Sequence, residues 1–255
     1  MAFPVYFVGA GPGDPELITV KGKRLIEEAD RVIYAGSLVP KDLLSSAKPG
    51  ARLIDSASLT LEETHALIVE GYRNEELVVR LHSGDPSLYG AIYEQMALLD
   101  RDGIPYEVVP GVSAVFAAAA RLKRELTVPG GSQTLILTRL GGKTPVPEEE
   151  SLRSLATHRS TLAIYLSVQA IDRVVDDLSE SYPLQTPVVV AYRIGWPDET
   201  FIHGTLEDIA QKVKNAGITR QALILVGEAF GKLDETRRSL LYDGSFSHGF
   251  RKARK

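Results

Sequence analysis

The sequence predicts an α/β protein made of two consecutive α/β domains. Short apolar runs that end in Gly, Ser, Pro or Asp alternate with helical patterns along most of the 255 residues. This alternation is typical of sheets whose strands are joined by helices. The series is interrupted once, at residues 127–132, where Pro129, Gly130 and Gly131 stand together. We therefore expect a first domain over residues 1–126, a second over 133–230 and a basic C-terminal tail over 231–255.

The composition excludes several kinds of site and partner. The chain is 44% hydrophobic and 24% charged, which is ordinary for a globular protein, and it has no cysteine, so disulfides, thiolate metal sites and a cysteine nucleophile are excluded. No apolar run approaches the roughly 18 residues of a membrane span. A net charge of −4 argues against general nucleic-acid binding, and the five histidines show no metal-ligand spacing. We expect a cytoplasmic protein without membrane, nucleic acid or protein-bound metal.

In the first domain, strands and helices are bounded by turn and capping residues. Thr19 can cap one helix, and Thr60 with Glu63 fits a capping box at the start of another. The expected strands are residues 4–8, 31–35, 52–54, 77–81 and 104–109. The expected helices are residues 20–29, 61–71, 88–100 and 114–122.

The second domain repeats the alternation. The expected strands are residues 134–138, 161–166, 188–192, 200–203 and 222–226. The expected helices are residues 148–157, 168–178 and 206–215. Residues 141–145 resemble the end of a P-loop but lack its upstream glycine, so we interpret them as a surface loop. The tail is predicted to be loosely docked rather than an anion-binding arm.

The stretch from Arg80 to Gly90 is the first candidate ligand loop. It follows a predicted buried strand, and open α/β sheets bind ligands where their strands end. Asp85 followed by Pro86 has the pattern of an N-cap with proline in the first helical turn. A capped strand-to-helix turn and a ligand loop are equally compatible with these residues.

The loop Gly9–Asp14 resembles a dinucleotide fingerprint without fitting it. Asp14 stands where the third glycine belongs, and Pro12 removes one backbone N–H from the phosphate cradle. A carboxylate there would repel a pyrophosphate, so we expect no NAD site. Ser113 is at least a helix cap, and its spacing does not decide whether it faces a ligand.

Three motifs together resemble those of the tetrapyrrole methyltransferases. They are Gly9–Asp14, Ser83-Gly84-Asp85-Pro86 with Tyr89-Gly90, and Pro110-Gly111-Val112-Ser113-Ala114, in that order and spacing. The resemblance covers residues 5–226. It implies two α/β domains with an S-adenosylmethionine (SAM) cleft between them, and S-adenosylhomocysteine as product. Four further stretches narrow it to an enzyme that methylates carbon 11 of a corrin precursor in cobalamin synthesis: residues 34–40, 56–60, 89–95 and 192–199. Ile194-Gly195 departs from the Ala-Ser expected there.

The resemblance also implies site residues. The cofactor would be bound by Pro12, Ser83, Gly84, Asp85, Leu88, Ser113, Ala114, Leu166, Arg193 and Ile194. The tetrapyrrole would contact Asp14, Ser37 and Arg139. Asp14 could equally cap the following helix, and Trp196 could be a packed lid residue or a ligand contact.

The implied reaction is an in-line transfer of a methyl group from sulfur to an electron-rich ring carbon. Such a reaction requires donor and acceptor to be aligned and water to be excluded. No catalytic triad is visible, so the catalytic residues are left unassigned. The substrate is a polycarboxylate, which predicts Arg and Lys around its site. We also expect a homodimer, the commonest symmetric assembly.

Two alternatives stay open at this point. One is a SAM methyltransferase of the same fold that acts on another tetrapyrrole, on a protein or on ribosomal RNA. The other is a Rossmann-type nucleotide-dependent oxidoreductase or regulator, for which NAD binding would be diagnostic.

Overall fold

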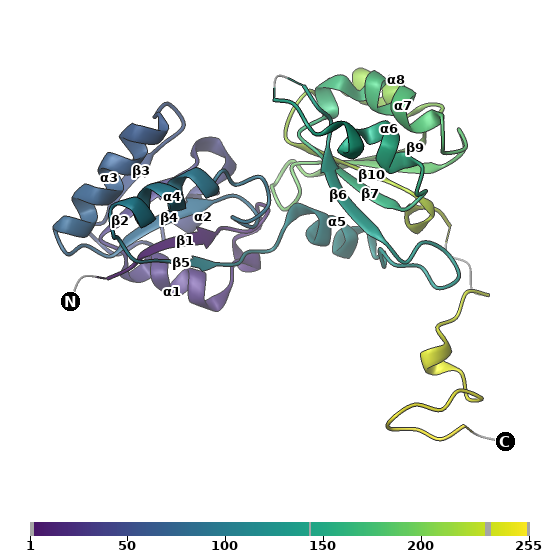
Figure 1. Cartoon of the computed structure of the whole chain (residues 1–255), viewed down its shortest axis with the longest axis horizontal. Helices are drawn as coiled ribbons and strands as arrows, with labels where there is room; N and C mark the ends of the chain where they lie inside the picture. Colours follow the sequence, from purple (N-terminus) through teal and green to yellow (C-terminus); the bar gives the residue numbers. More distant parts are fainter. Residues whose placement is uncertain (1–2, 143, 233–235, 254–255) are drawn as a thin grey trace. The chain divides into compact units, whose positions relative to one another are not determined.

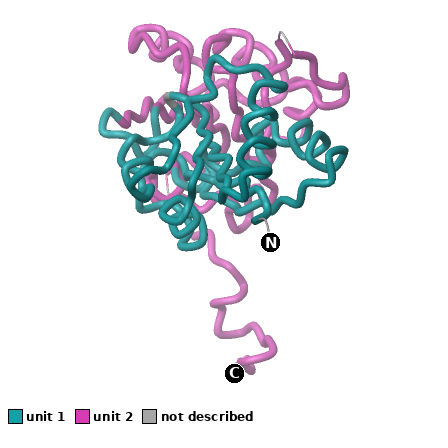
Figure 2. Tube along the Cα trace, turned by 90° about the vertical axis from the view of Figure 1, so that its left-hand side faces the viewer, with its two compact units in different colours: residues 1–117, 193–198 teal, residues 118–192, 199–255 magenta. Residues whose placement is uncertain are grey.

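The computed structural model describes residues 3–142, 144–232 and 236–253 and contains two five-stranded sheets (Figure 1). The chain divides into two compact units (Figure 2). Unit 1 comprises residues 1–117 with 193–198, and unit 2 comprises residues 118–192 with 199–255. The predicted α/β class is confirmed. The predicted domain limits at residues 126 and 133 stay a prediction.

Sheet 1 belongs to unit 1 and is entirely parallel. Its strand order is β3-β2-β4-β1-β5. The strands are β1 (Val5–Gly9), β2 (Arg31–Tyr34), β3 (Arg52–Asp55), β4 (Val78–His82) and β5 (Tyr106–Val109). All five predicted strands of the first domain are confirmed within two residues at each end. Because the strands run the same way, all their carboxyl ends lie at one edge.

Helices cover both faces of sheet 1, as expected for a buried parallel sheet (Figure 1). On one face, Leu25, Ile26 and Leu43 from α1 and α2 pack on Val32 and Val79. On the other face, α3 and α4 bring Ile68 and Leu99 onto Phe7, Ile33 and Val78. The helices of these faces are α1 (Val20–Glu28), α2 (Lys41–Leu44), α3 (Leu61–Arg73) and α4 (Tyr93–Arg101). The next helix is α5 (Ala114–Leu122).

The predicted caps of α1 and α3 are confirmed. Thr19 accepts a hydrogen bond from the Gly22 N–H at 3.1 Å. At α3 the capping box is complete, because the Thr60 hydroxyl accepts from the Glu63 N–H and the Glu63 carboxylate accepts from the Thr60 N–H. Each cap satisfies backbone donors that the first helical turn leaves unpaired.

The predicted helix over residues 88–100 is wrong at its start, because α4 begins only at Tyr93. Tyr89 and Ala91 have φ angles of 56° and 50°, which a right-handed helix excludes. Between them, Gly90 approaches the Pro86 carbonyl so closely that a side chain there would collide with it. Asp85 therefore does not cap a helix, and the stretch after it is a series of turns.

Sheet 2 belongs to unit 2 and has the order β6-β7-β10-β8-β9. Only β6 and β7 pair in parallel, and the other three pairings are antiparallel. The strands are β6 (Leu135–Arg139), β7 (Thr161–Tyr165), β8 (Pro187–Tyr192), β9 (Thr200–Thr205) and β10 (Ala222–Val226). The strands predicted for the second domain are confirmed within two residues.

Three helices pack on one face of sheet 2. They are α6 (Leu152–Ala156), α7 (Ile171–Ser179) and α8 (Ile209–Asn215). Leu152, Val174 and Val213 from these helices meet Ile164 and Ile224 of the sheet. Two predicted helices begin as short 3-10 turns, η3 (Glu148–Glu150) and η4 (Val168–Ala170). The remaining described 3-10 turns are η1 (Pro15–Leu17), η2 (Gly36–Leu38), η5 (Glu228–Phe230) and η6 (Leu240–Tyr242).

Candidate functional site

Three loops meet at the carboxyl edge of sheet 1, and they carry the three motifs singled out in the sequence. They follow β1, β4 and β5, the three adjacent strands at one side of the sheet. We call residues 9–14, 83–88 and 110–113 the three-loop cluster. Because β1 lies between β4 and β5, its loop contacts both others.

The backbones of the cluster touch at glycines. Gly11 and Gly84 exchange two hydrogen bonds of 3.2 and 2.7 Å and form an isolated bridge. A Cβ at Gly9 would lie 2.6 Å from both the Gly111 Cα and the Gly84 carbonyl oxygen, closer than side chains tolerate. Gly84 has a φ of 65°, a conformation open to glycine. The motif glycines therefore allow the backbones of the three loops to interlock.

Asp85 ties two of the loops together. Its Oδ1 accepts from the Ser87 N–H at 2.8 Å, within its own loop. Its Oδ2 accepts from the Gly111 N–H at 3.0 Å, across to the loop after β5. Carboxylates that accept from backbone N–H groups form stronger bonds than neutral acceptors do. Asp85 is therefore a brace of the three-loop cluster in this structure.

Two basic side chains of β4 lie buried beneath the cluster. Arg80 is 8% exposed, and its guanidinium donates to Gln95 Oε1 at 3.1 Å and to the Ile33 carbonyl at 3.2 Å, both neutral acceptors. Burial lowers the pKa of Arg80 to about 10, so it keeps its charge at neutral pH. His82 is 4% exposed, and burial together with the Arg80 charge lowers its pKa to about 3. Its ring is therefore neutral at pH 7.

The segment 193–198 leaves sheet 2 between β8 and β9 and packs in unit 1 against the first loop of the cluster. A Cβ at Gly13 would lie 2.6 Å from the Ile194 carbonyl oxygen, and one at Gly195 would lie 2.5 Å from the Asp14 nitrogen. Close glycine contacts thus join this segment to residues 13 and 14. Ile194 is buried there.

Arg193 is held by neighbours in the same segment. Its guanidinium lies 4.4 Å from the centroid of the Trp196 ring, and its Nε donates to Asp198 at 2.7 Å. Its φ of 47° is strained for a non-glycine residue. Trp196 thus has a packing role.

The other predicted residues of unit 1 lie in or next to the cluster. Asp14 caps η1 by accepting from the Glu16 N–H at 3.0 Å, which confirms the helix-cap alternative without testing a ligand role. Pro12 and Ser113 are buried, Leu88 and Ala114 are partly exposed, and Ala114 begins α5. The side chain of Ser37, in η2, lies outside what the structure describes.

Two predicted residues lie in unit 2, at the ends of its strands. Leu166 follows β7 with a φ of 54° and a side chain that is 69% exposed. A strained backbone and an exposed apolar side chain together are typical of a ligand contact. Arg139 ends β6 and donates to the carbonyls of Thr144 and Pro145 at 3.0 and 2.8 Å. Arg139 therefore braces its own loop.

Sequence reasoning missed three contributions to this site. The Asp85–Gly111 bond joins residues 26 positions apart, which no local pattern signals. The packing of residues 193–198 on Gly13 also has no local signal, although the family resemblance grouped Arg193 and Ile194 with Pro12. The third is Arg80, which is buried in the sheet and is not a surface cation. The alternation of side chains along β4 puts Arg80 and His82 on the same face, and this alternation could have indicated that both are buried.

The described residues also bear on metal binding and membrane spanning. Nowhere in residues 3–142, 144–232 and 236–253 do three His, Asp or Glu side chains gather as a cation site. Every helix in that part of the chain is too short or too polar to cross a membrane.

Comparison with known proteins connects this geometry to a family. Residues 4–210 match the family model of the Tetrapyrrole (Corrin/Porphyrin) Methylases. A cobalt-precorrin-4 C(11)-methyltransferase of Methanocaldococcus jannaschii is 54% identical over 252 residues, covering 98% of this chain and 97% of the relative. The solved structure of a cobalt precorrin-4 methyltransferase of cobalamin biosynthesis matches with a TM-score of 0.87 and 48% identity, covering 89% of this chain and 96% of that one.

A second solved structure was determined with a ligand. It is a uroporphyrin-III C-methyltransferase of Thermus thermophilus in complex with S-adenosylhomocysteine. It matches with a TM-score of 0.76 and 31% identity, covering 92% of this chain and 98% of that one.

Proposed function

The chain belongs to the tetrapyrrole (corrin/porphyrin) methylases, and from this we propose that it is a SAM-dependent C-methyltransferase of cobalamin biosynthesis. Its substrate is precorrin-4 or cobalt-precorrin-4, and its product carries one additional methyl group on carbon 11. The high identity to a relative of that name over nearly the whole chain supports this choice within the family.

The observation that carries the proposal is the three-loop cluster. Its loops are locked by glycine contacts and by Asp85, which gives a rigid edge at the end of the sheet where α/β proteins bind ligands. A methyl transfer requires its two reactants to be held in line, and rigid positioning is what such an edge provides.

The cluster fits SAM better than a dinucleotide. Pro12 offers no N–H to a phosphate, and the Asp14 carboxylate would repel one. SAM carries no phosphate, so neither feature opposes its binding. We assign the cofactor to the residues that the family resemblance implies: Pro12, Ser83, Gly84, Asp85, Leu88, Ser113, Ala114, Leu166, Arg193 and Ile194.

The chain's own contribution to the reaction is positional. SAM, when bound, supplies an electrophilic methyl group on sulfur. Asp85 keeps the loops after β4 and β5 in register, and the buried Pro12 and Ile194 exclude water from their neighbourhood. His82 is buried and its pKa of about 3 makes it a weak base, so it is unsuited to accept a proton from the reacting carbon. The nucleophile is the substrate's own electron-rich ring carbon.

We assign Asp14, Ser37 and Arg139 to the tetrapyrrole. A carboxylate at position 14 can accept hydrogen bonds from pyrrole N–H groups or stabilise positive charge on the ring. A guanidinium at position 139 retains N–H donors for a substrate carboxylate beside those that bond Thr144 and Pro145.

The test is mass spectrometry after incubation with SAM and a single tetrapyrrole. Precorrin-4 and cobalt-precorrin-4 are supplied separately, and uroporphyrinogen III serves as the control. We expect a gain of one methyl group on one or both corrin precursors, located at carbon 11 by NMR, and none on uroporphyrinogen III. Methylation of uroporphyrinogen III alone, or of no tetrapyrrole, would contradict the proposal.

We further propose a homodimer in the cytoplasm. A symmetric dimer is the commonest assembly of such enzymes. Light scattering at micromolar concentration should give about twice the 27.8 kDa of the chain, and a mass near one chain would refute the dimer. Fractionation of the source cells should recover the protein with the cytoplasmic contents.

A further inference from the structure

Residues 236–253 form a separate ordered segment, which we call the C-terminal arm (yellow in Figure 1). The arm is folded by its own hydrogen bonds. Arg251 donates to the carbonyls of Leu241 and Asp243 at 2.7 and 2.6 Å and forms a bridge with His248. Asp243 also accepts from the Ser245 N–H at 2.8 Å. These bonds give the arm a defined shape without an apolar core.

The arm exposes an unusual amount of apolar surface for its size. Phe250 is fully exposed, and η6 presents its apolar side chains to solvent. The exposed fractions are Leu240 65%, Leu241 50%, Tyr242 82%, Phe246 41% and Phe250 101%. Several exposed apolar side chains within one short segment are typical of a surface that a partner covers.

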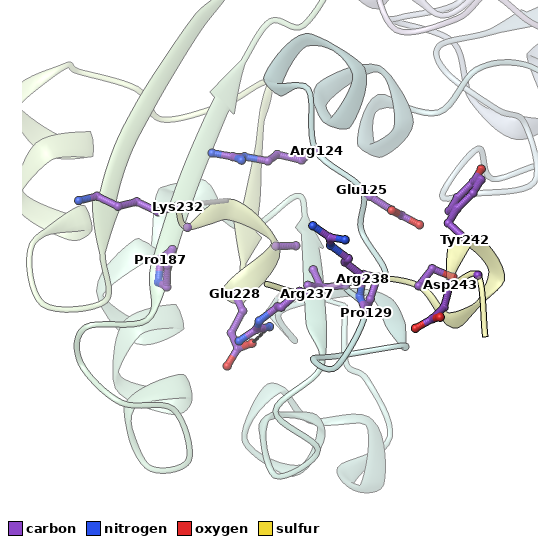
Figure 3. A pocket seen from close by; sticks show the side chains of 15 residues that line it. Arg124, Glu125, Pro129, Pro187, Glu228, Lys232, Arg237, Arg238, Tyr242 and Asp243 are labelled. Atoms are coloured by element: carbon purple, nitrogen blue, oxygen red, sulfur yellow. Dashed lines mark hydrogen bonds and ion pairs between the residues drawn. The ribbon is translucent and has the colours of Figure 1, made fainter. Parts of the chain in front are cut away.

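The arm is attached at the edge of sheet 2 away from the predicted site residues. Arg237 donates to Glu228 at 2.8 Å just after β10 (Figure 3), and Gly227 donates to the Pro187 carbonyl where β8 begins. A cavity of about 970 Å³ lies at this edge, lined by the arm and Pro187. Leu166 lies at the opposite end of β7, a strand of five residues that spans roughly 17 Å. The arm is therefore attached at the end of sheet 2 opposite the loops that contain Leu166 and Arg139.

The charge of the tail is opposite to that of the rest of the chain. Residues 231–255 contain seven Lys and Arg against three Asp and Glu, whereas residues 1–230 contain 22 against 30. An arm with a basic charge and an apolar surface is therefore complementary to the acidic body of a second copy. The arm's own hydrogen-bonded fold leaves these apolar side chains exposed.

We propose that the C-terminal arm docks on the body of a second copy of this chain and buries its apolar side chains there. The inference rests on the homodimer proposed above and adds the segment that holds the dimer together. Basic groups of the arm attract the acidic partner, and the apolar groups supply burial on contact.

The first test compares dimer dissociation constants of full-length proteins by analytical ultracentrifugation. We expect the double variant Tyr242→Ala/Phe250→Ala to dimerise at least tenfold more weakly than the wild type. Val20→Ala removes an apolar side chain that is 90% exposed on unit 1 and should leave the constant unchanged. Equal constants for wild type and double variant would overturn the proposal, as would a monomeric wild type. Methyl transfer is assayed separately, so failure of the arm and failure of the enzyme activity are distinguishable.

The second test identifies the surface that the arm contacts, and it does not require a variant with weakened dimerisation. The chain has no cysteine, so Leu240→Cys can be labelled selectively with a photoreactive maleimide. Equal amounts of ¹⁴N- and ¹⁵N-labelled protein are mixed and irradiated. Cross-links that join light to heavy chains are expected. Cross-links confined to single chains would overturn the proposal, and so would arm-dependent pelleting with phosphatidylglycerol vesicles in place of mixed-label cross-links.

Discussion

The edges of the two sheets that carry the predicted site residues are built differently. In unit 1, a parallel sheet delivers three neighbouring loops to one edge, and their backbones contact one another at glycines. In unit 2, the loops after β6 and β7 are joined through side chains. The Leu140 N–H donates to the Ser167 hydroxyl at 2.8 Å, and Arg139 braces its own loop.

The two edges also differ in the residue type that adopts a positive φ angle inside the loops. Within the three-loop cluster the positive φ angles occur at glycines, among them Gly11 and Gly84, and glycine adopts them at little cost. In the loop after β7 the residue with a positive φ is Leu166, whose αL conformation costs roughly 1–2 kcal/mol. The loops of unit 1 are thus packed at glycines, whereas the loop after β7 holds a non-glycine residue in a strained conformation.

The largest effect is expected from a methyl group inside the cluster. Gly9→Ala would place a Cβ 2.6 Å from backbone atoms of Gly111 and Gly84, which cannot move aside individually. We expect a loss of about 3 kcal/mol in the free energy of unfolding, at the upper end for overpacking. Gly142→Ala, in a unit 2 loop with no atom within 4 Å of its Cβ, is the control. Urea unfolding measures both, and equal stabilities would show that the loops do not interlock.

The second prediction concerns the buried His82. Its pKa is about 3 in the folded protein against 6.5 for the free side chain, so between these values the unfolded chain binds the extra proton. The stability that depends on the neutral ring is full above pH 6.5 and is lost as the pH falls toward 3. For one such group, the free energy of unfolding changes by up to about 1.4 kcal/mol per pH unit.

Replacing His82 shows how much of the pH dependence of the unfolding free energy comes from this imidazole. His82→Gln should flatten the dependence of unfolding free energy on pH between 6.5 and 5, relative to the wild type. His158→Gln, at an exposed histidine, should leave the wild-type slope in place. Parallel curves for wild type and His82→Gln would mean that His82 is accessible to solvent protons in the folded state.

The third prediction tests Asp85 as the brace between loops. Asp85→Asn removes the charge and leaves one oxygen for two N–H donors, so we expect the apo protein to lose about 1–2 kcal/mol. Asp55 Oδ1 likewise accepts from the N–H two residues on, that of Ala57, at 2.8 Å, and among the described residues it bonds no second loop. Asp55→Asn should therefore change the melting temperature far less. Equal melting temperatures for the two variants would remove Asp85 from this role.

The smallest expected change in stability is at Leu166. Leu166→Gly relieves the αL strain and should leave stability unchanged or raise it by up to about 1 kcal/mol. It should weaken S-adenosylhomocysteine binding about tenfold or more, because a buried Leu contributes about 1.5–3 kcal/mol. Arg159→Gly, with a φ of 49° at the other end of β7, should match it in stability and bind normally. Normal binding by Leu166→Gly would place Leu166 outside the cofactor site.

Features of the fold that depend on neighbouring residues could be predicted from the sequence, whereas features that depend on contacts between distant residues could not. The strands and the caps at Thr19 and Thr60 follow from neighbouring residues, and they were predicted within two residues. The start of α4 failed because Tyr89 and Ala91 adopt positive φ angles around a close approach at Gly90, and a periodic apolar pattern does not register such turns.

The candidate site was predictable as motifs but not as contacts. The order of the glycine motifs identified the loops, since parallel strands must end at one edge. The Asp85–Gly111 bond and the packing of residues 193–198 on Gly13 depend on the tertiary fold, so no spacing in the sequence announces them. An Asp-Pro pair suggested a helix cap because that local use of a carboxylate is the commoner one.

The central claim is that the interlocked edge of unit 1 belongs to a SAM site and not to a dinucleotide site. Isothermal titration calorimetry of the full chain with S-adenosylhomocysteine, NAD and NADP tests it directly. We predict binding of one S-adenosylhomocysteine per chain at micromolar affinity, and no heat of binding with either dinucleotide, because Pro12 and Asp14 disable the phosphate cradle. Micromolar binding of NAD without any response to S-adenosylhomocysteine would contradict the account.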